Sequence, residues 1–235
     1  MRLEKVLDAA KVKGLRTGEN PARWRGQLDH LLPRHSKSSD DHHSSMAYVE
    51  VPAFLASLGQ KRGFSVLALR FAILTAARTG EVIGARWDEI DMEAGLWTIP
   101  AQRMKARRAH RVPLTAPALE VLNEVKGAHA AWVFPGPGLQ APLSNMAMLS
   151  LLKRAKLNCT VHGFRSAFRD WAAETTNFPS EVCEMALAHA VANKTEAAYR
   201  RGDLFEKRRA LMEAWSGFLT EPKASNVVQL KAVAK

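Results

Sequence analysis

A stretch near the amino terminus divides this chain into two parts of very unequal size. Residues 35–45 read His-Ser-Lys-Ser-Ser-Asp-Asp-His-His-Ser-Ser, with no aliphatic side chain and with much serine and charge. A segment of this composition has nothing to bury and is typical of an exposed linker. We therefore expect residues 35–47 to join a short piece, residues 1–34, to one large domain over residues 48–220, which a tail at residues 221–235 follows.

The short piece has the pattern of two helices. One is expected over Leu3–Lys13, ending at Gly14, and the other opens at Asn20 with Pro21 in its first turn. Two helices this short bury too little apolar surface to fold alone. We therefore expect residues 1–34 to be the last part of a larger helical domain.

The large domain is predicted to be mainly α with a small antiparallel β-sheet, an α+β fold. Two short strands, Leu96–Pro100 and His110–Leu114, flank a basic turn, and Ile90–Met92 is a candidate third strand. Helical periodicity marks the remaining segments: Pro52–Leu58, Phe64–Ala77, Glu81–Trp87, Pro117–Lys126, Ser144–Lys156, Gly163–Glu174, Ser180–His189 and Leu204–Leu219.

The charge balance favours a polyanionic partner. Thirty-four Lys and Arg residues against 23 Asp and Glu give a net charge of +11, and nucleic acid is the first candidate because cationic side chains that neutralise phosphates release counterions. A basic surface that serves only solubility is the alternative. The longest apolar run, Phe64–Ala77, contains Arg70 and is too short to span a membrane. Cys159 and Cys183 lack metal-site or disulfide-scaffold spacing, which indicates a reducing compartment.

The densest cluster of positive charge lies in the predicted hairpin. Residues 102–111 hold five Lys and Arg residues and no acid, and a turn this basic repels itself unless it meets phosphates. We expect Arg103, Arg107, Arg108 and Arg111 to contact DNA. A solvated charged loop is the alternative.

A second basic constellation lies at a predicted helix start. His162 and Arg165 are three residues apart in His162-Gly163-Phe164-Arg165, at the end of a helix that favours anions. Such a pair can share one phosphate. Alone, the spacing is more typical of a capped helix with an exposed arginine.

The order of motifs along the chain is more specific than any one of them. The sequence has Ala77-Arg78-Thr79-Gly80-Glu81, then Lys105, then His162-Gly163-Phe164-Arg165, then Leu187-Ala188-His189, and then Ala197-Ala198-Tyr199-Arg200-Arg201. In this order the chain resembles the tyrosine recombinases, most closely the P4-like integrases of phages and genomic islands, over roughly residues 49–219. Members of that family are expected to carry an arm-binding domain and a complete core-binding domain, and only the end of the latter fits before residue 35.

The resemblance implies a site and its chemistry. Arg78 and Arg165 would clamp the nonbridging oxygens of a phosphodiester, with no metal or nucleotide cofactor. Tyr199 would attack to form a 3′-phosphotyrosyl link, and Lys105 would protonate the departing 5′-oxygen. His162 is the candidate proton acceptor for Tyr199, and His189 would donate a hydrogen bond to the phosphate, for which a neutral imidazole would suffice.

The implied function is site-specific cleavage and rejoining of DNA strands. The expected partners are double-stranded DNA and further copies assembled on it, and the expected location is the bacterial cytoplasm, at the nucleoid. Two alternatives stay open: a truncated, non-catalytic DNA-binding remnant of an integrase, and a type IB topoisomerase-like activity without site choice.

Several single residues also have alternative interpretations. Glu81 is either the salt-bridge partner of Arg78 or a first-turn helix acid, and His189 could be a buried, satisfied histidine. A group of acids, Asp88, Glu89, Asp91 and Glu93, suggests a two-metal nuclease, but strand alternation favours a solvated strand end. The run Asp40-Asp41-His42-His43 could bind a metal adventitiously.

Overall fold

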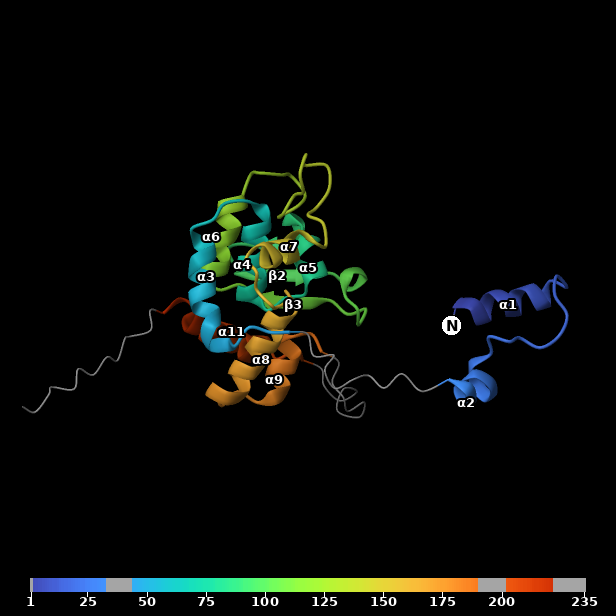
Figure 1. Cartoon of the computed structure of the whole chain (residues 1–235). Helices are drawn as coiled ribbons and strands as arrows, with labels where there is room; N and C mark the ends of the chain where they lie inside the picture. Colours follow the sequence, from blue (N-terminus) through green and yellow to red (C-terminus); the bar gives the residue numbers. More distant parts are fainter. Residues whose placement is uncertain (1, 33–43, 190–201, 222–235) are drawn as a thin grey trace, which may run out of the picture. The chain divides into compact units, whose positions relative to one another are not determined.

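The chain forms two compact units in a computed structural model that describes residues 2–32, 44–189 and 202–221. The division falls between His42 and His43, and Figure 1 shows the larger unit as a bundle of helices with a small sheet.

In the smaller unit, one regular helix is held to an irregular segment by Asn20. Helix α1 spans Arg2–Val12, and the Asn20 side-chain amide donates to the Glu4 carbonyl at 2.9 Å and to Asp8 Oδ1 at 2.7 Å. The second helix expected from Asn20 is wrong. Trp24–Leu28 is a single irregular turn in which Gly26 has a φ of 78°, and only Asp29–Leu31 (α2) is helical beyond it, because a positive φ interrupts a right-handed helix.

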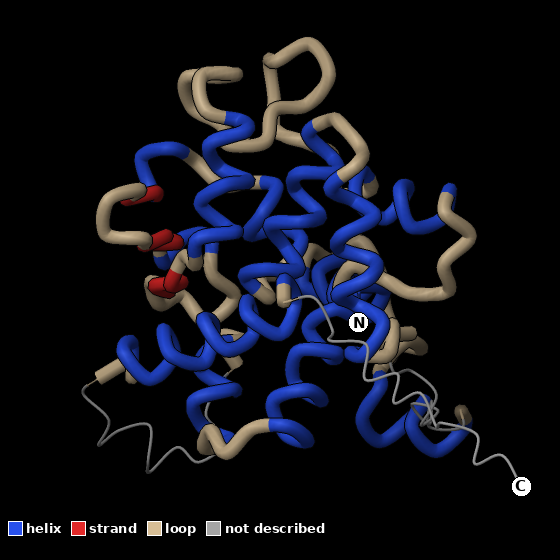
Figure 2. Tube along the Cα trace, turned by 90° about the vertical axis from the view of Figure 1, so that its left-hand side faces the viewer, coloured by secondary structure: helices blue, strands red, loops and turns tan. Residues whose placement is uncertain are grey.

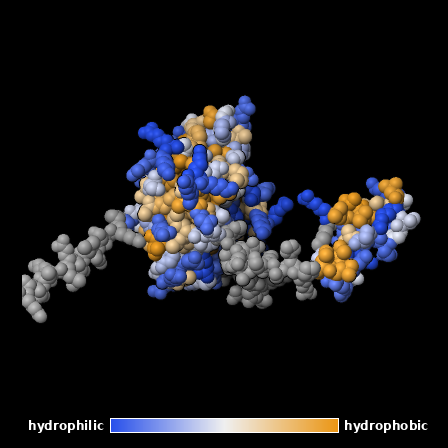
Figure 3. Space-filling view, viewed as in Figure 1, coloured by the Kyte–Doolittle hydropathy of each residue, from blue (hydrophilic) through white to orange (hydrophobic). Residues whose placement is uncertain are grey.

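The smaller unit leaves much of its apolar surface in solvent. Leu3, Val6 and Val12 of α1 are 71%, 63% and 88% exposed. Figure 3 shows the apolar side chains on this surface. The unit therefore has little core of its own, as expected from the length of its helices.

A single buried helix, α4, is the centre of the larger unit. It spans Phe64–Thr75 and has nine buried residues, which lie on every face of the helix. This pattern is typical of a helix enclosed by others. Its one charged residue, Arg70, reaches Glu124 of the neighbouring helix at 2.7 Å. The apolar run that is too short for a membrane thus forms the core.

Most of the other helices of the larger unit lie around α4, as Figure 1 shows, and α8 and α9 lie below them in this view. α3, α5, α6, α7 and α11 contact α4 directly, and α8 and α9 pack on each other. Their bounds are Val51–Gly59 (α3), Thr79–Ile83 (α5), Ala116–Val125 (α6), Ala147–Arg154 (α7), Gly163–Thr175 (α8), Ser180–Ala186 (α9) and Phe205–Thr220 (α11).

Aromatic rings join the carboxy-terminal helices. Trp215 of α11 lies 5.0 Å from Trp171 and 5.4 Å from Phe168, both on α8. Its indole nitrogen donates to the Ile73 carbonyl of α4 at 2.9 Å. This contact ties the last helix, and hence the chain that follows the predicted nucleophile, to the centre of the unit.

The three predicted strands form one antiparallel sheet in the order β1-β2-β3. They span Ile90–Asp91 (β1), Leu96–Ile99 (β2) and His110–Pro113 (β3), with Ile99 opposite His110 at the root of the hairpin. Figure 2 shows the strands stacked at one side of the larger unit. The predicted fold class, mainly α with a small antiparallel sheet, is confirmed.

Candidate active site

Arg78 lies where the chain turns from α4 into α5. The turn is made by Ala76, whose φ is 49°, and Arg78 is the extended residue just before α5. The Glu81 carboxylate accepts from the Arg78 backbone nitrogen at 2.9 Å and from its guanidinium at 2.8 Å. Arg78 Nη2 donates to the Ala188 carbonyl at 3.0 Å. Of the two interpretations of Glu81, the structure favours the salt-bridge partner.

Arg165, on the first turn of α8, is a buried cation. It is 4% exposed, and its guanidinium donates to two backbone carbonyls, Ala76 and, at 2.6 Å, Leu187. Its Nε is buried and has no hydrogen-bond partner among the described residues. Burial, together with the positive charge of Arg78, lowers the pKa of Arg165 to about 10, so it stays charged at neutral pH.

His189 follows the carboxyl end of α9 and lies next to the two arginines. Its Nε2 lies 3.4 Å from Arg165 Nη2, and its Nδ1 lies 2.6 Å from Glu184 Oε2. Its side chain is 42% exposed, so the alternative of a buried, satisfied histidine is wrong. Arg78, Arg165 and His189, which are far apart in the sequence, therefore come together around the carbonyls of Leu187 and Ala188.

Close packing of the entering chain explains the glycine in the His-Gly-Phe-Arg motif. The Ser44 carbonyl accepts from the Thr160 nitrogen at 3.0 Å, so residues 44–47, assigned above to the linker, begin in contact with the larger unit. A Cβ at Gly163 would lie 2.5 Å from that carbonyl and 2.8 Å from Ser45 Cα. His162, just before α8, is exposed.

The hairpin loop between β2 and β3 presents three exposed basic side chains, those of Lys105, Arg107 and Arg108. None of the three makes a side-chain hydrogen bond or ion pair with the described part of the chain. Arg107 has a φ of 54°, at the tip of the loop. These residues are thus available to a ligand.

Arg103 and Arg111, which we also expect to contact DNA, are engaged with the protein instead. The Arg103 guanidinium pairs with Glu89 and donates to the Glu81 carbonyl, next to Gly84, where a Cβ would lie 2.8 Å from Arg103 Nη2. Arg111 makes a two-pronged ion pair with Asp203, at 2.7 and 2.9 Å. The sequence does not distinguish them from Arg107 and Arg108 because their acidic partners are distant in the chain.

Residues that the sequence did not single out hold the hairpin and the segment before α11 in place. Arg208, 1% exposed, donates to the Asp203 carboxylate at 2.8 Å and to its carbonyl at 2.7 Å, and also to the Arg111 carbonyl. His110 of β3 is hydrogen-bonded to the Ala186 backbone. Its burial and the positive charges of Arg208 and Arg78 lower the pKa of His110 to about 4.

The acids near the strands do not gather at one point. Glu89 pairs with Arg103 and accepts from the Trp97 indole at 3.0 Å, Asp88 pairs with Arg86, and Asp91 caps the turn to Ala94. Glu89 is 6% exposed in its side chain, so the expectation of a solvated strand end is wrong for it. No group of three potential metal-binding side chains is found in residues 2–32, 44–189 and 202–221.

Two predicted features lie outside the described residues. These are Tyr199 and the run Asp40-Asp41-His42-His43. The chain on either side of Tyr199 is described, ending at His189 and starting again at Gly202, and Asp203 is fixed by Arg111 and Arg208.

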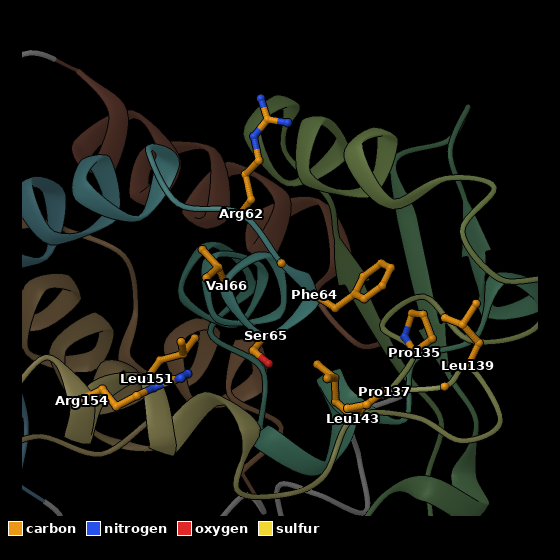
Figure 4. Close-up of a pocket in the computed structure, with 13 residues that line it drawn as sticks. Arg62, Phe64, Ser65, Val66, Pro135, Pro137, Leu139, Leu143, Leu151 and Arg154 are labelled. Atoms are coloured by element: carbon orange, nitrogen blue, oxygen red, sulfur yellow. The ribbon is translucent and has the colours of Figure 1, made fainter.

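A pocket of about 360 Å³ lies at the start of α4 and is separate from these residues. In Figure 4 Phe64 points towards Pro135, and Leu151 lies on the other side. Arg62 and Arg154 are its charged lining residues, and none of the predicted catalytic residues lines it. In the described part of the chain, no helix has the length and apolarity that crossing a bilayer requires.

Comparison with known proteins gives a consistent family match. Residues 50–204 match the model of the phage integrase family. The chain is 34% identical over 190 residues to prophage integrase IntZ and 37% identical over 161 residues to prophage integrase IntA, both of Escherichia coli K12. These matches cover 79% and 66% of this chain but 47% and 39% of the relatives, so the chain spans about half their length or less.

Solved structures with the same fold include two phage integrases. An integrase from mycobacterium phage Brujita gives a TM-score of 0.60 at 18% identity, over 94% of this chain and 72% of that one. A lambda integrase dimer bound to a COC′ core site gives 0.56 at 18% identity, over 80% and 69%. At this identity the likeness establishes the fold.

Proposed function

Since this chain belongs to the phage integrase family of tyrosine recombinases, we propose that it cleaves and rejoins DNA strands at specific sites through a 3′-phosphotyrosyl intermediate. The observation that carries the proposal is the buried guanidinium of Arg165. It has no acidic partner among the described residues, and its Nε is unpartnered. A buried cation without a counter-charge is costly unless an anion binds beside it.

A phosphodiester fits this requirement. Arg165 and Arg78 would each contact nonbridging oxygens, on which negative charge grows as the phosphorus becomes five-coordinate. Planar guanidiniums suit this task better than lysines because they present paired donors in a fixed geometry. Glu81 accepts hydrogen bonds from the backbone nitrogen and the guanidinium of Arg78 and so fixes this side chain. This reduces the movement of Arg78 that phosphate binding requires.

The remaining steps use groups on three segments. The Tyr199 oxygen forms a bond to phosphorus while the bond from phosphorus to the 5′-oxygen breaks, and the tyrosyl proton passes to His162. Lys105, on the exposed hairpin loop, supplies the proton that the departing 5′-oxygen takes up. Attack of a 5′-hydroxyl from another strand reverses these steps and joins the new strand.

We propose double-stranded DNA as the partner, with several copies assembled on it. The net charge of +11 and the three exposed basic residues of the hairpin loop support the DNA contact. The lambda integrase that shares the fold is a dimer bound to its core site, which is the basis for proposing assembly here.

Covalent capture on nicked DNA tests the proposed function. The substrate is a pool of duplexes with a randomised core and a nick that lets the short fragment carrying the freed 5′-hydroxyl diffuse away, so that the 3′-phosphotyrosyl link persists in denaturing gels. We expect an adduct with the wild-type chain and none with Tyr199→Phe. The chain has two tyrosines, so Tyr48→Phe is the matched control and should still form the adduct. Binding without any adduct would instead identify a non-catalytic remnant.

A further inference from the structure

Glu184 of α9 links two side chains of the site that the sequence does not relate to it. Its Oε2 lies 2.6 Å from His189 Nδ1, and its Oε1 accepts from Arg169 Nε at 2.7 Å. Arg169 also donates to the Ser180 hydroxyl at 3.0 Å, which fixes its guanidinium at the start of the same helix. Arg169 lies one turn after Arg165 on α8, so the three side chains connect α8 to the end of α9.

The protonation state of Glu184 follows from its two partners. Partial burial acts to raise the pKa of Glu184, but the hydrogen bonds from Arg169 and His189 outweigh burial and hold the pKa below its usual value. The carboxylate is therefore ionised at neutral pH, and both of its oxygens only accept hydrogen bonds. His189 Nδ1 must then carry the proton that this contact requires.

The charged groups around the ring indicate what its other nitrogen does. Arg165 Nη2, a donor, lies 3.4 Å from Nε2, and Arg78 binds the carbonyl of the preceding residue, Ala188. With its proton on Nδ1, a neutral His189 offers an acceptor at Nε2. It can donate to a phosphate only after it takes up a second proton, whose charge Glu184 would offset. The expectation that a neutral imidazole suffices as donor does not fit this geometry.

We propose that Glu184 is a positioning residue, which fixes the tautomer of His189 with the proton on Nδ1 and directs Nε2 towards the phosphate-binding arginines. The effect on cleavage rests on the proposed function, whereas the tautomer itself does not. The arrangement follows the general logic of a carboxylate that orients an imidazole through its distal nitrogen.

The substitution Glu184→Gln tests the tautomer because glutamine has one acceptor oxygen in place of two. Arg169 can only donate, so it retains that oxygen, and the amide nitrogen is left to face His189 Nδ1. An amide N–H donates, so Nδ1 must lose its proton and the neutral ring must carry it on Nε2. The substitution therefore exchanges the two ring nitrogens without changing the size of the side chain.

Nitrogen-15 NMR of the full chain, at about pH 9 where an ordinary histidine is neutral, reads this exchange directly. His189→Gln identifies the His189 signals among the eight histidines. We expect a protonated Nδ1 and a bare Nε2 in the wild type and the reverse in Glu184→Gln. A wild-type ring with its proton on Nε2, or the same tautomer in both proteins, would overturn the proposal.

Adduct formation on the nicked duplex pool tests the consequence for catalysis. Glu184→Gln should form the adduct at least about tenfold more slowly than the wild type, because a neutral Nε2–H that also faces the Arg165 donor replaces an imidazolium donor whose charge a carboxylate offsets. Glu213→Gln, which removes an exposed carboxylate of α11, should match the wild type. Equal rates for the two variants would overturn the positioning role. Absence of any wild-type adduct would contradict the proposed function alone, and the tautomer measurement would still decide the role of Glu184.

Discussion

Among single residues, burial separates Arg165 from the other basic side chains of the site. Its Nη1 and Nη2 donate to two backbone carbonyls, and its Nε has no partner among the described residues, whereas Arg78 is 27% exposed in its side chain and is neutralised by Glu81. The two arginines therefore differ in what binding a phosphate changes. Glu81 and Glu184 act on the charge of Arg165 without pairing with it, so a bound phosphate would be its direct counter-ion.

Arg165→Ala should consequently slow adduct formation by about a hundredfold or more, the scale of a lost transition-state donor, and weaken DNA binding to a smaller extent. Single-turnover adduct formation and binding titrations measure the two effects. Lys153→Ala, which removes an exposed cation from α7, is the control. Adduct formation within twofold of the wild type would show that Arg165 is not part of the phosphate clamp.

Lys105 can be tested separately because its proposed role is proton donation. A substrate with sulfur in place of the bridging 5′-oxygen has a leaving group that needs little protonation. This substrate should restore cleavage to Lys105→Ala and should leave Arg165→Ala slow, since the clamp acts on the nonbridging oxygens. If sulfur fails to rescue Lys105→Ala while the wild type cleaves it, the proton comes from another group, with His162 the next candidate.

At the scale of elements, the hairpin is attached to the helices through its root and is exposed at its tip. Arg103 binds Glu89 and the Glu81 carbonyl, and His110 is bonded to Ala186 at the end of α9. The exposed Lys105 lies two residues after the first of these anchors. The anchoring thus limits where the proposed acid can lie relative to Arg78 and His189.

Arg103→Ala should destabilise the fold because it leaves the Glu89 carboxylate, 6% exposed, without its cationic partner. Breaking a buried pair by removing one partner costs about 3–5 kcal/mol, measured as the free energy of unfolding in urea. Arg107→Ala, at the exposed tip of the same loop, should change this free energy by less than about 0.5 kcal/mol. Equal effects of the two substitutions would contradict the assignment of Arg103 as an anchor.

Periodicity predicted most of these elements, and tertiary partners account for what it missed. The strands around the basic turn and the helices of the larger unit were predicted within a few residues. The helix expected over Ser180–His189 ends at Ala186 instead, because Ala188 adopts a φ of 49°. Sequence spacing could not separate Arg103 from Arg107, since Glu89 reaches Arg103 only through folding. Glu184 was missed for the same reason, although a glutamate five residues before His189 was a usable signal.

For the molecule as a whole, His110 makes stability depend on pH. Burial lowers its pKa to about 4 in the folded chain, whereas an unfolded histidine has a pKa of about 6.5. As the pH falls below about 6.5, His110 becomes protonated in the unfolded state but stays neutral in the folded state. The free energy of unfolding therefore declines until about pH 4 and then levels off.

This single group should cost about 2 kcal/mol of stability between pH 7 and pH 5, at about 1.4 kcal/mol per pH unit below 6.5. The measurement compares the loss of unfolding free energy over this range in the wild type and in His110→Gln, which cannot take up the proton. Between pH 7 and pH 5, His110→Gln should lose about 2 kcal/mol less unfolding free energy than the wild type, because the other titrating groups contribute equally to both proteins. Equal losses would mean that His110 is protonated in the folded chain.

The net charge of +11 also predicts how the whole molecule responds to salt, and the placement of the charge determines the size of the response. Each phosphate contact contributes about 0.9 to the slope of log affinity against log salt. If Arg107 and Arg108 each meet a phosphate, replacing both by alanine should flatten this slope by nearly two units. Lys61→Ala with Arg62→Ala removes the same charge from the exposed loop before α4. Because the slope counts released counterions and not net charge, the control variant should change the slope less than the hairpin variant does. An equal change in the two variants would assign the effect to total charge. An unchanged slope in the hairpin variant would show that the hairpin is not part of the DNA interface.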